Sequence, residues 1–364
     1  MSLKKLKIPV LVGLSGGVDS AASLYLLKQR GYNVVGVTFK LWEFSSTKAR
    51  RNNLCCSIEG ISAAKELCQK LECEYILRDV SEKFFDEIVQ NFLQEYRRGR
   101  TPSPCILCNP QIKWKNLIAL ADELGIEFVA TGHFARTFYS PVSIGERNLL
   151  RGADTEKDQS YFLYRLSADE LSRTIFPAGH LRKSETRRIA SYFNLPVSSP
   201  RESQELCFLP DDDVQNFLKR YLPEGIQSGK IVDTSGKTVG EHRGIALYTI
   251  GQRSGLGGGF SQPMYVKKII SEENTIVIGT ADEILSSHFT VENLVWHRQM
   301  NKKFFCTVRI RHRHSDAPAQ VAVRGKRAEV FFKKPQRAIA PGQSAVFYDG
   351  FAVIGGGIIA DVID

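Results

Sequence analysis

The first third of the chain alternates short apolar segments with helical patterns, and this alternation limits the possible folds more than any other feature. Four apolar runs have the length of buried strands, namely Ile8–Leu14, Val34–Phe39, Tyr75–Leu77 and Phe128–Thr131. Helical periodicity occupies residues 61–71, 82–96 and 113–124. Strands separated by helices predict an α/β fold with a doubly wound parallel sheet, in which ligands bind beyond the carboxyl ends of the strands.

The rest of the chain changes character twice. Residues 163–220 show mostly helical patterns, and a hairpin is expected around Ser235–Gly236. Short alternating strands and glycine-containing turns fill residues 285–364, which predicts a small β-barrel or sandwich. We therefore expect three domains: a nucleotide-binding domain with a helical part (1–210), a small central domain (211–282) and a C-terminal β-barrel (283–364).

Composition adds limits on partners and compartment. The 364 residues carry a formal charge of +10, which favours a polyanionic partner, although a merely basic soluble protein is the alternative. No apolar run reaches the roughly 18 residues that cross a bilayer, and the first ten residues lead directly into a strand. We expect a cytoplasmic protein without a membrane partner, whose eight cysteines are thiols, metal ligands or redox groups.

A loop rich in glycine and serine separates the first strand from the first helix. Its residues are Gly13, Leu14, Ser15, Gly16, Gly17, Val18, Asp19 and Ser20. Glycines let backbone N–H groups converge on an anion, and the following helix contributes its positive end. Asp19 is the candidate ligand for a magnesium ion bound with the nucleotide. The alternative is an ordinary capped turn.

The phosphate loop (Gly13–Ser20) is not a Walker loop, because no Gly-Lys-Ser/Thr follows. Its SGGVDS segment resembles the loop of the N-type ATP pyrophosphatases, which implies adenylation of an oxygen and release of pyrophosphate. By itself this resemblance leaves GMP synthetases, asparagine synthetases, tRNA lysidine synthetases and tRNA thiolases open.

Two cysteine-containing segments narrow the choice: GRTPSPCILCN at 99–109 and SQELCF at 203–208. Exchange of oxygen for sulfur needs a sulfur donor, best held as a protein persulfide, and a second thiol that cleaves the S–S bond. Thiolates form more readily beside cationic groups, and Cys108 has Arg97, Arg98, Arg100 and Lys113 close in sequence.

Along nearly its whole length the sequence resembles the bacterial and organellar tRNA-specific 2-thiouridylases. The matching segments are GLSGGVDS, the GRTPxPxxxCN segment followed by IKW, ATGHFAR (130–136), KDQSYFL (157–163), FPAGHLRKSETR (176–187), ESQELCF (202–208) and YTIGQRSGLG (248–257). The resemblance implies ATP-dependent 2-thiolation of the wobble uridine, position 34, in tRNAs of the Lys, Glu and Gln type, giving 2-thiouridine, AMP and pyrophosphate. Cys207 would carry the persulfide, received from a sulfur-carrier protein, and Cys108 would be its partner. The sequence leaves open whether the persulfide attacks the uridine directly or releases free sulfide. A Cys108–Cys207 disulfide would remain, and we expect a monomer.

The resemblance also implies binding residues. Phe39 and Gly132 would join the phosphate loop in binding ATP. The positions implied for tRNA are Ser103, Pro104, Cys105, His133, Lys157, Asp158, Gln159, Arg311, His312 and Gln343. From spacing alone a core aromatic is the better interpretation of Phe39. A structural histidine and a helix cap are the alternatives for His133 and Asp158.

Cys105 allows two interpretations. Relatives carry either aspartate or cysteine at this position, so it need not be catalytic. Cys105 and Cys108 also have metal-ligand spacing, but the sequence has no second CxxC, and we expect no iron–sulfur cluster.

Basic residues are dense in the C-terminal part. Arg309, Arg311 and Arg313 alternate with apolar or aromatic neighbours, which predicts one strand face that contacts RNA phosphates. His312 stands where relatives usually have an aromatic residue, which leaves stacking there in doubt.

Two other functions share part of these features. An adenylating ligase that uses ammonia or an amine would have the same phosphate loop but no use for two thiols. An RNA-binding protein with an inactive nucleotide fold would have the basic surface without needing an intact SGGVDS.

Overall fold

The computed structural model describes residues 7–42, 58–139, 147–198, 206–209 and 213–363. The chain divides into two compact units. The first comprises Met1–Glu87, Cys105–Asp212 and Phe351–Val353, and the second comprises Ile88–Pro104, Asp213–Gly350 and Ile354–Asp364. No helix in the described parts is long and apolar enough to span a membrane.

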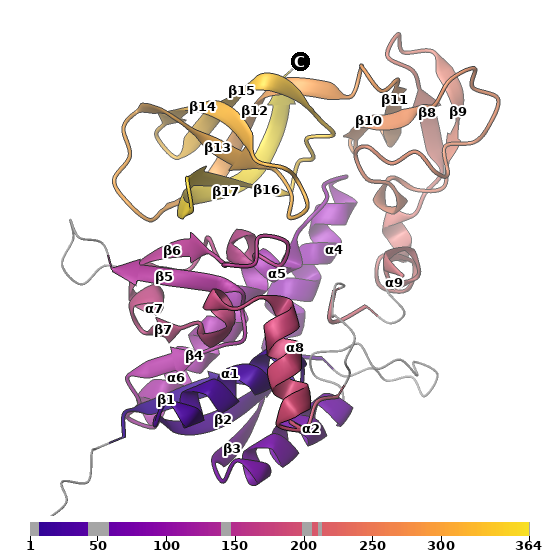
Figure 1. Ribbon diagram of the computed structural model, residues 1–364. Helices are drawn as coiled ribbons and strands as arrows, with labels where there is room; N and C mark the ends of the chain where they lie inside the picture. The colour runs from indigo at the N-terminus through magenta and orange to yellow at the C-terminus, as the bar shows by residue number, and fades with distance from the viewer. Residues whose placement is uncertain (1–6, 43–57, 140–146, 199–205, 210–212, 364) are drawn as a thin grey trace, which may run out of the picture. The chain divides into compact units, whose positions relative to one another are not determined.

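A parallel sheet with strand order β3-β2-β1-β4-β7 forms the centre of the first unit (Figure 1). Its strands are β1 (Pro9–Gly13), β2 (Asn33–Lys40), β3 (Glu74–Asp79), β4 (Phe128–Ala130) and β7 (Thr174–Ile175). The doubly wound parallel sheet expected from the sequence is confirmed. Strand β7 is an addition, because it lies in a region whose pattern predicts mostly helix.

Helices cover both faces of this sheet. The helices of this unit are α1 (Val18–Gln29), α2 (Ile58–Lys70), α3 (Ser81–Phe84), α5 (Pro104–Cys108), α6 (Lys115–Glu123), α7 (Ala168–Ser172) and α8 (Lys183–Tyr192). Val10 and Val12 of β1 pack with residues of α1, α2 and α8, whereas Leu11 packs with Leu117 of α6. Alternate side chains of one strand point to opposite faces, so each face needs its own helical cover.

Smaller elements complete the first unit. An antiparallel hairpin joins β5 (Ala135–Tyr139) and β6 (Arg147–Arg151). A π-helical turn at Phe85–Val89 interrupts the helix predicted at 82–96, and a second at Asn109–Trp114 leads into the helix predicted from residue 113. Short 3-10 helices lie at Ser160–Phe162 and Pro177–His180.

The second unit begins with helix α4 (Gln90–Arg97) and contains α9 (Val214–Tyr221), with 3-10 turns at Pro223–Gly225 and Ile245–Leu247. A small sheet has the order β10-β11-β8-β9, and its strands are β8 (Gly229–Val232), β9 (Thr238–His242), β10 (Tyr265–Ile270) and β11 (Thr275–Gly279). Strands β8 and β9 form the expected hairpin, with Gly236 at φ +87° in the turn.

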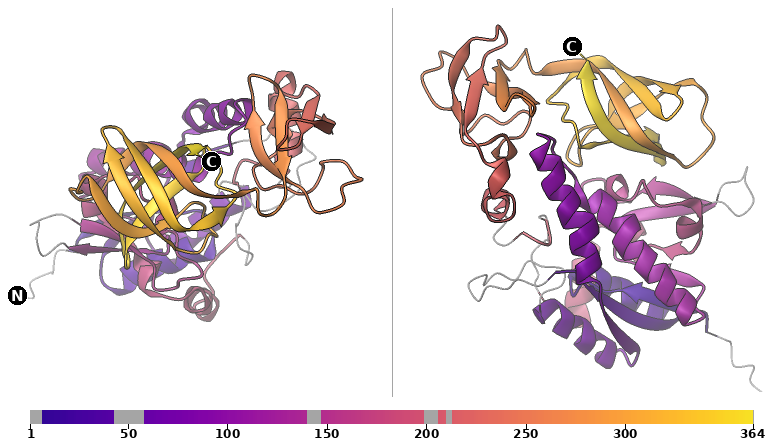
Figure 2. Two further views of the ribbon diagram at one scale, coloured as in Figure 1. Left: turned by 90° about the horizontal axis from the view of Figure 1, so that it is seen from above. Right: turned by 180° about the vertical axis from the view of Figure 1, so that it is seen from behind.

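A closed barrel occupies the C-terminal part, and its strands curve around one core in both views of Figure 2. The strands are β12 (Leu285–Trp296), β13 (Lys303–Arg309), β14 (Ala317–Arg324), β15 (Arg327–Arg337), β16 (Ser344–Asp349) and β17 (Ala352–Ile363). Closure results from the pairing of β12 with both β15 and β17. Strand β13 ends at Arg309, so the prediction that Arg311 and Arg313 continue its face is wrong: both lie beyond the strand, at the turn that leads to β14.

Candidate functional site

The phosphate loop joins β1 to α1 and is held by its own hydroxyl groups. The Ser15 backbone N–H donates to the Ser20 hydroxyl at 3.2 Å, and that hydroxyl donates to the Gly17 carbonyl at 3.0 Å. The two serine hydroxyls lie 3.2 Å apart. No side chain caps α1 at its N-cap residue Gly17, so the first N–H groups of this helix keep their capacity to bind an anion.

Two glycines permit close backbone contacts around the phosphate loop. Gly16 has φ +73°, and a Cβ added there would lie 2.4 Å from the Gly60 carbonyl oxygen. A Cβ on Gly132, beyond the end of β4, would lie 2.6 Å from the Ser20 backbone nitrogen. Gly132 therefore lies against the first turn of α1, and any larger residue at either position would displace the backbone.

Asp19 in the first turn of α1 has two partners from α8. The Lys183 ammonium lies 2.5 Å from one carboxylate oxygen, and the Thr186 hydroxyl donates to the other at 2.9 Å. Lys183 also lies over the Phe134 ring, at 5.7 Å from its centroid. No local sequence pattern predicts that Lys183 lies beside the phosphate loop. Its position within the FPAGHLRKSETR segment was the available signal.

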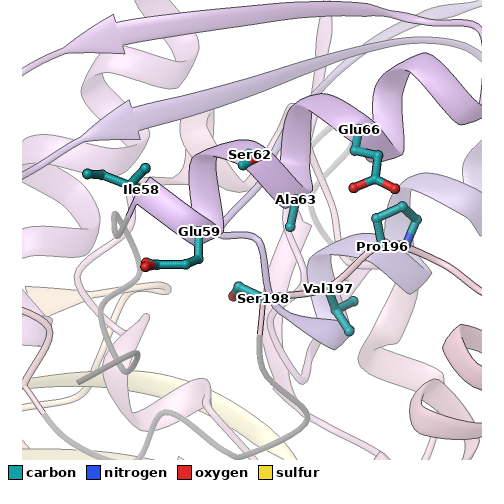
Figure 3. Close-up of a pocket in the computed structure, with 8 residues that line it drawn as sticks. All are labelled: Ile58, Glu59, Ser62, Ala63, Glu66, Pro196, Val197 and Ser198. Atoms are coloured by element: carbon teal, nitrogen blue, oxygen red, sulfur yellow. The ribbon is translucent and has the colours of Figure 1, made fainter. Parts of the chain in front are cut away.

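A pocket borders the other side of this loop (Figure 3). The Ser198 hydroxyl and backbone N–H both donate to the Gly16 carbonyl, at 3.2 and 2.9 Å. The lining residues are Ile58, Glu59, Ser62, Ala63, Glu66, Pro196, Val197 and Ser198. Two carboxylates in this lining, those of Glu59 and Glu66, disfavour phosphate in this pocket.

Phe39 and His133 lie at the carboxyl ends of β2 and β4, the two strands that flank β1. Phe39, near the end of β2, is partly exposed and packs against the core beneath α6. His133 follows β4, and its Nδ1 lies 2.9 Å from the Thr131 hydroxyl. Burial and the nearby charge of Lys113 lower the pKa of His133 to about 3, so the ring is neutral near pH 7.

The two candidate reactive cysteines belong to the same unit as the phosphate loop. Cys108 is buried at the end of α5, directly before a π-helical turn, an element often found at functional sites. The Asn109 amide nitrogen donates to the Phe162 carbonyl at 2.9 Å. Cys207 is partly exposed in the short described stretch 206–209, beside Phe208, whose ring centroid lies 5.8 Å from that of Phe84. Cys105 is also partly exposed.

Lys157, Asp158 and Gln159 have different environments. Asp158 is buried, and its carboxylate accepts from the backbone N–H groups of Gly152 and Ser160 at 3.0 and 3.1 Å. Its other oxygen lies 3.7 Å from the guanidinium of buried Arg151. These contacts favour the structural interpretation of Asp158. Gln159 is partly exposed, and its side-chain oxygen accepts from the Phe134 N–H at 2.9 Å.

In the second unit, Gln343 binds the segment that precedes the cysteines. Its amide nitrogen donates to the Thr101 carbonyl at 2.9 Å, and the Thr101 N–H donates to the Pro341 carbonyl at 2.8 Å. Ser103 and Pro104 end this segment. Gln343, which the resemblance assigns to tRNA, therefore has a protein partner here.

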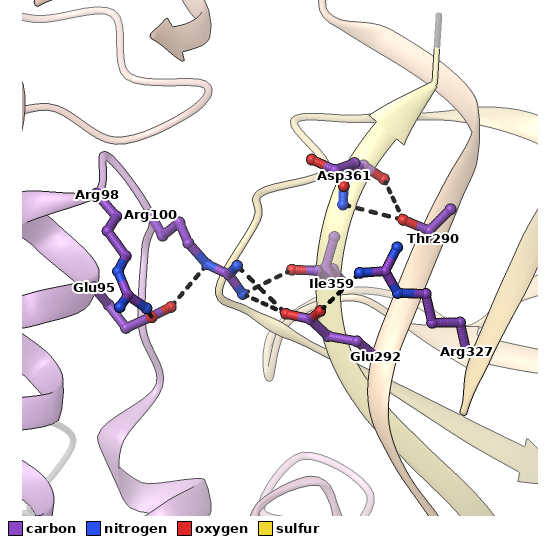
Figure 4. Close-up of polar contacts among 8 residues, drawn as sticks. All are labelled: Glu95, Arg98, Arg100, Thr290, Glu292, Arg327, Ile359 and Asp361. Atoms are coloured by element: carbon purple, nitrogen blue, oxygen red, sulfur yellow. Dashed lines mark hydrogen bonds and ion pairs between the residues drawn. The ribbon is translucent and has the colours of Figure 1, made fainter. Parts of the chain in front are cut away.

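Arg100 adds charged contacts to the same segment (Figure 4). Its guanidinium lies 2.8 Å from Glu95 of α4 and 3.4 Å from Glu292 of β12. Arg327 of β15 lies 3.7 Å from the second oxygen of Glu292. Arg311 donates to the Arg337 carbonyl at 3.2 Å, and its neighbour His312 lies in the same turn region after β13.

A parallel sheet with a glycine-rich anion loop after its first strand defines a nucleotide-binding α/β protein, and family comparisons agree. Residues 8–211 match a family described as the tRNA methyl transferase HUP domain. Residues 215–280 match a tRNA methyl transferase PRC-barrel domain, and residues 286–359 match an aminomethyltransferase beta-barrel domain.

Full-length relatives identify the family more narrowly. The tRNA-specific 2-thiouridylase MnmA 1 of Caldanaerobacter subterraneus subsp. tengcongensis is 42% identical over 358 residues, which cover 96% of this chain and 97% of the relative. The tRNA-specific 2-thiouridylase MnmA of Carboxydothermus hydrogenoformans is 42% identical with the same coverages, and that of Clostridium beijerinckii is 38% identical over 98% and 100%. The chain belongs to the tRNA-specific 2-thiouridylase family, as the sequence motifs predict.

Proposed function

We propose that this protein is a tRNA-uridine 2-sulfurtransferase, which uses ATP to replace the 2-oxygen of the wobble uridine, position 34, with sulfur. Family membership supports thiolation of tRNA as the general activity. The observation that carries the proposal is the combination, in one compact unit, of an uncapped phosphate loop with Cys108 and Cys207.

The phosphate loop and the residues around it bind ATP and support the adenylation step. The first N–H groups of α1, with the serine hydroxyls, bind the phosphates, and Lys183 supplies the cation that a Walker loop would carry in its own sequence. Phe39 and Gly132 contact the adenosine part of ATP. The uridine 2-oxygen attacks the α-phosphate, and pyrophosphate leaves.

Asp19 has the hard oxygen donors that Mg²⁺ prefers. In this structure one Asp19 oxygen pairs with Lys183 and the other accepts from Thr186. Asp19 can bind a metal ion when the Lys183 ammonium moves from it to a phosphate. When bound, Mg²⁺ neutralises phosphate charge as pyrophosphate departs.

The sulfur part of the reaction uses the two cysteines. The terminal sulfur of a Cys207 persulfide attacks C2 of the adenylated uridine, and AMP leaves with the former 2-oxygen. The Cys108 thiolate then attacks the Cys207 sulfur, which breaks the bond to the transferred sulfur and forms a Cys108–Cys207 disulfide. An external reductant restores the thiols.

The substrates are tRNAs of the Lys, Glu and Gln type. To react, the uridine must leave its stack, as base-modifying enzymes require. The partly exposed Gln159 is better suited than the buried Asp158 to form hydrogen bonds with the edge of the base. The resemblance also assigns Ser103, Pro104, Cys105, His133 and Lys157 to tRNA. In the C-terminal barrel, the resemblance assigns Arg311, His312 and Gln343 to tRNA binding.

Partners and organisation complete the proposal. A persulfide sulfur-carrier protein loads Cys207, and the enzyme works as a cytoplasmic monomer without an iron–sulfur cluster. The domains are residues 1–210, 211–282 and 283–364, a division supported by the three matched ranges.

The family descriptions also name methyl transfer, and the two activities can be separated directly. The test combines purified protein, unmodified tRNA, Mg-ATP and a persulfide donor, with thiolated RNA read out by its retardation in a mercury-containing gel. A band that requires ATP and is lost in Cys207→Ser, but not in Cys306→Ser, is expected. Multiple-turnover thiolation by Cys207→Ser, or a methylated RNA formed from S-adenosylmethionine, would refute the proposal.

A further inference from the structure

Helix α2 ends in a backbone motif that brings two cysteines together. The Cys73 N–H donates to the Cys68 carbonyl at 3.0 Å, and the Glu72 N–H donates to the Gln69 carbonyl at 3.1 Å. Glu72 has φ +47°. This is a Schellman ending, in which the first and last residues of the turn, here Cys68 and Cys73, usually make a hydrophobic contact.

Both residues at this contact are free thiols. The Cys73 thiol donates to the Cys68 carbonyl at 3.6 Å, and each thiol shifts the pKa of the other. Cys68 is fully buried, whereas Cys73 is partly exposed. One residue of the pair is therefore partly open to solvent, and the other is not.

The surroundings make the two thiols chemically unequal. The hydrogen bond from Cys68 and the charge of Lys28, whose ammonium donates to the Glu72 carbonyl at 2.9 Å, lower the pKa of Cys73. The same hydrogen bond and burial raise the pKa of Cys68. A thiolate reacts with oxidants faster than a thiol, so Cys73 is the sulfur that reacts first.

The buried thiol also touches the support of the phosphate loop. A Cβ added to Gly36 of β2 would lie 2.5 Å from the Cys68 sulfur and 2.8 Å from a methyl carbon of Leu14. Leu14 and Cys68 belong to the same core cluster, and the Leu14 N–H donates to the Val37 carbonyl at 2.7 Å. Movement of the Cys68 sulfur therefore alters the packing beneath the phosphate loop, because protein cores are close-packed.

We propose that Cys68 and Cys73 form a redox-sensitive site, separate from the thiols of sulfur transfer, whose oxidation to a disulfide weakens nucleotide binding. A peroxide oxidises the Cys73 thiolate to a sulfenic acid and is itself reduced to water. The Cys68 thiol attacks that sulfur, the S–S bond forms, the S–O bond breaks, and water leaves with the thiol proton. The effect on ATP rests on the proposed nucleotide site.

The test uses the full chain with Cys108→Ser and Cys207→Ser, so that these two thiols cannot contribute. After hydrogen peroxide treatment, tryptic digestion separates Cys68 (residues 66–70) from Cys73 (residues 71–78) unless a disulfide joins the two peptides. We expect the joined peptides by mass spectrometry, and ATP binding weakened by about tenfold in calorimetry, equivalent to about 1.4 kcal/mol. Dithiothreitol reverses both.

Cys73→Ser in the same background is the variant that abolishes both effects, and Cys306→Ser is the matched control that keeps them. Absence of the joined peptides, or joined peptides with unchanged ATP affinity, overturns the inference. So does an equal loss of ATP affinity in the peroxide-treated Cys73→Ser protein. The joined peptides are detected whether or not the chain binds ATP, so failure of the proposed function is distinguished from failure of this site.

Discussion

The ammonium of Lys183 lies 2.5 Å from the carboxylate of Asp19, although 164 residues separate them in sequence. The phosphate loop contains an acidic residue and no lysine, so its own sequence lacks the cation expected at a polyphosphate site. Helix α8 brings that cation to the first turn of α1. Asp19 and Lys183 neutralise each other in the ligand-free chain, and we expect phosphate to compete for the ammonium.

Replacement of Lys183 tests this competition. We expect Lys183→Met to weaken ATP binding by about tenfold or more, because a charged hydrogen bond is lost and the Asp19 carboxylate is left to repel phosphate. AMP, with fewer phosphates, should be affected less. Calorimetric titration with both nucleotides measures the difference. Lys65→Met, an exposed lysine of α2, is the matched control, and an equal loss in both variants would rule out a specific role.

The close approach at Gly16 predicts a steric effect on the phosphate loop. Gly16→Ala combines a strained positive φ with a contact of 2.4 Å to Gly60, so we expect ATP binding to be lost and unfolding to become easier by more than about 1 kcal/mol. Gly31→Ala is the control, because Gly31 has φ +86° but nothing near its added Cβ. Urea denaturation and ATP titration of both variants provide the comparison. Equal losses of stability and ATP affinity in the two variants would show that the positive φ, and not the contact with Gly60, causes the effect.

The pKa of His133 predicts a loss of stability in acid. The unfolded chain takes up a proton on this side chain near pH 6.5, whereas the folded chain does so only near pH 3. Between these values the free energy of unfolding therefore falls as pH falls, by about 1.4 kcal/mol per unit from this group. His133→Asn, whose amide can still bond to Thr131, should show a shallower decline in urea denaturation from pH 7 to 4.5. Parallel curves would contradict the lowered pKa.

We expect Asp158 to contribute to the stability of the fold and not only to the binding of RNA. Asp158→Asn removes a buried charge and its ion pair with Arg151, so we expect the free energy of unfolding to fall by about 3 kcal/mol. Lys157→Ala, one residue away, should change it little. Chemical denaturation measures the free energy of unfolding of both variants. An unchanged value for Asp158→Asn would favour a role of Asp158 in hydrogen bonding to the uridine base.

Gln343 likewise either stabilises the fold through its bond to Thr101 or binds tRNA. Gln343→Glu cannot donate to the Thr101 carbonyl, so we expect a stability loss of about 1–3 kcal/mol from the unpaired oxygen. The measurement is thermal or urea unfolding, together with tRNA affinity. Reduced tRNA affinity at full stability would instead assign Gln343 to RNA.

The sequence determined the local features of this protein. Strand length, helical periodicity and glycine placement predict the parallel sheet and the phosphate loop, because these depend on residues close in the chain. The hairpin at Ser235–Gly236 is predictable for the same reason. The family motifs were equally readable, since each is a short continuous segment.

Contacts between distant segments were decided only by the tertiary structure. The pairing of Lys183 with Asp19 and the bond from Gln343 to Thr101 join residues that no local pattern links. The burial of Asp158 and the end of β13 at Arg309 likewise depend on neighbours from other elements. Period-two alternation continues through Arg313 in the sequence, but a strand extends only as far as partner strands pair with it. Local propensity cannot specify where that pairing stops.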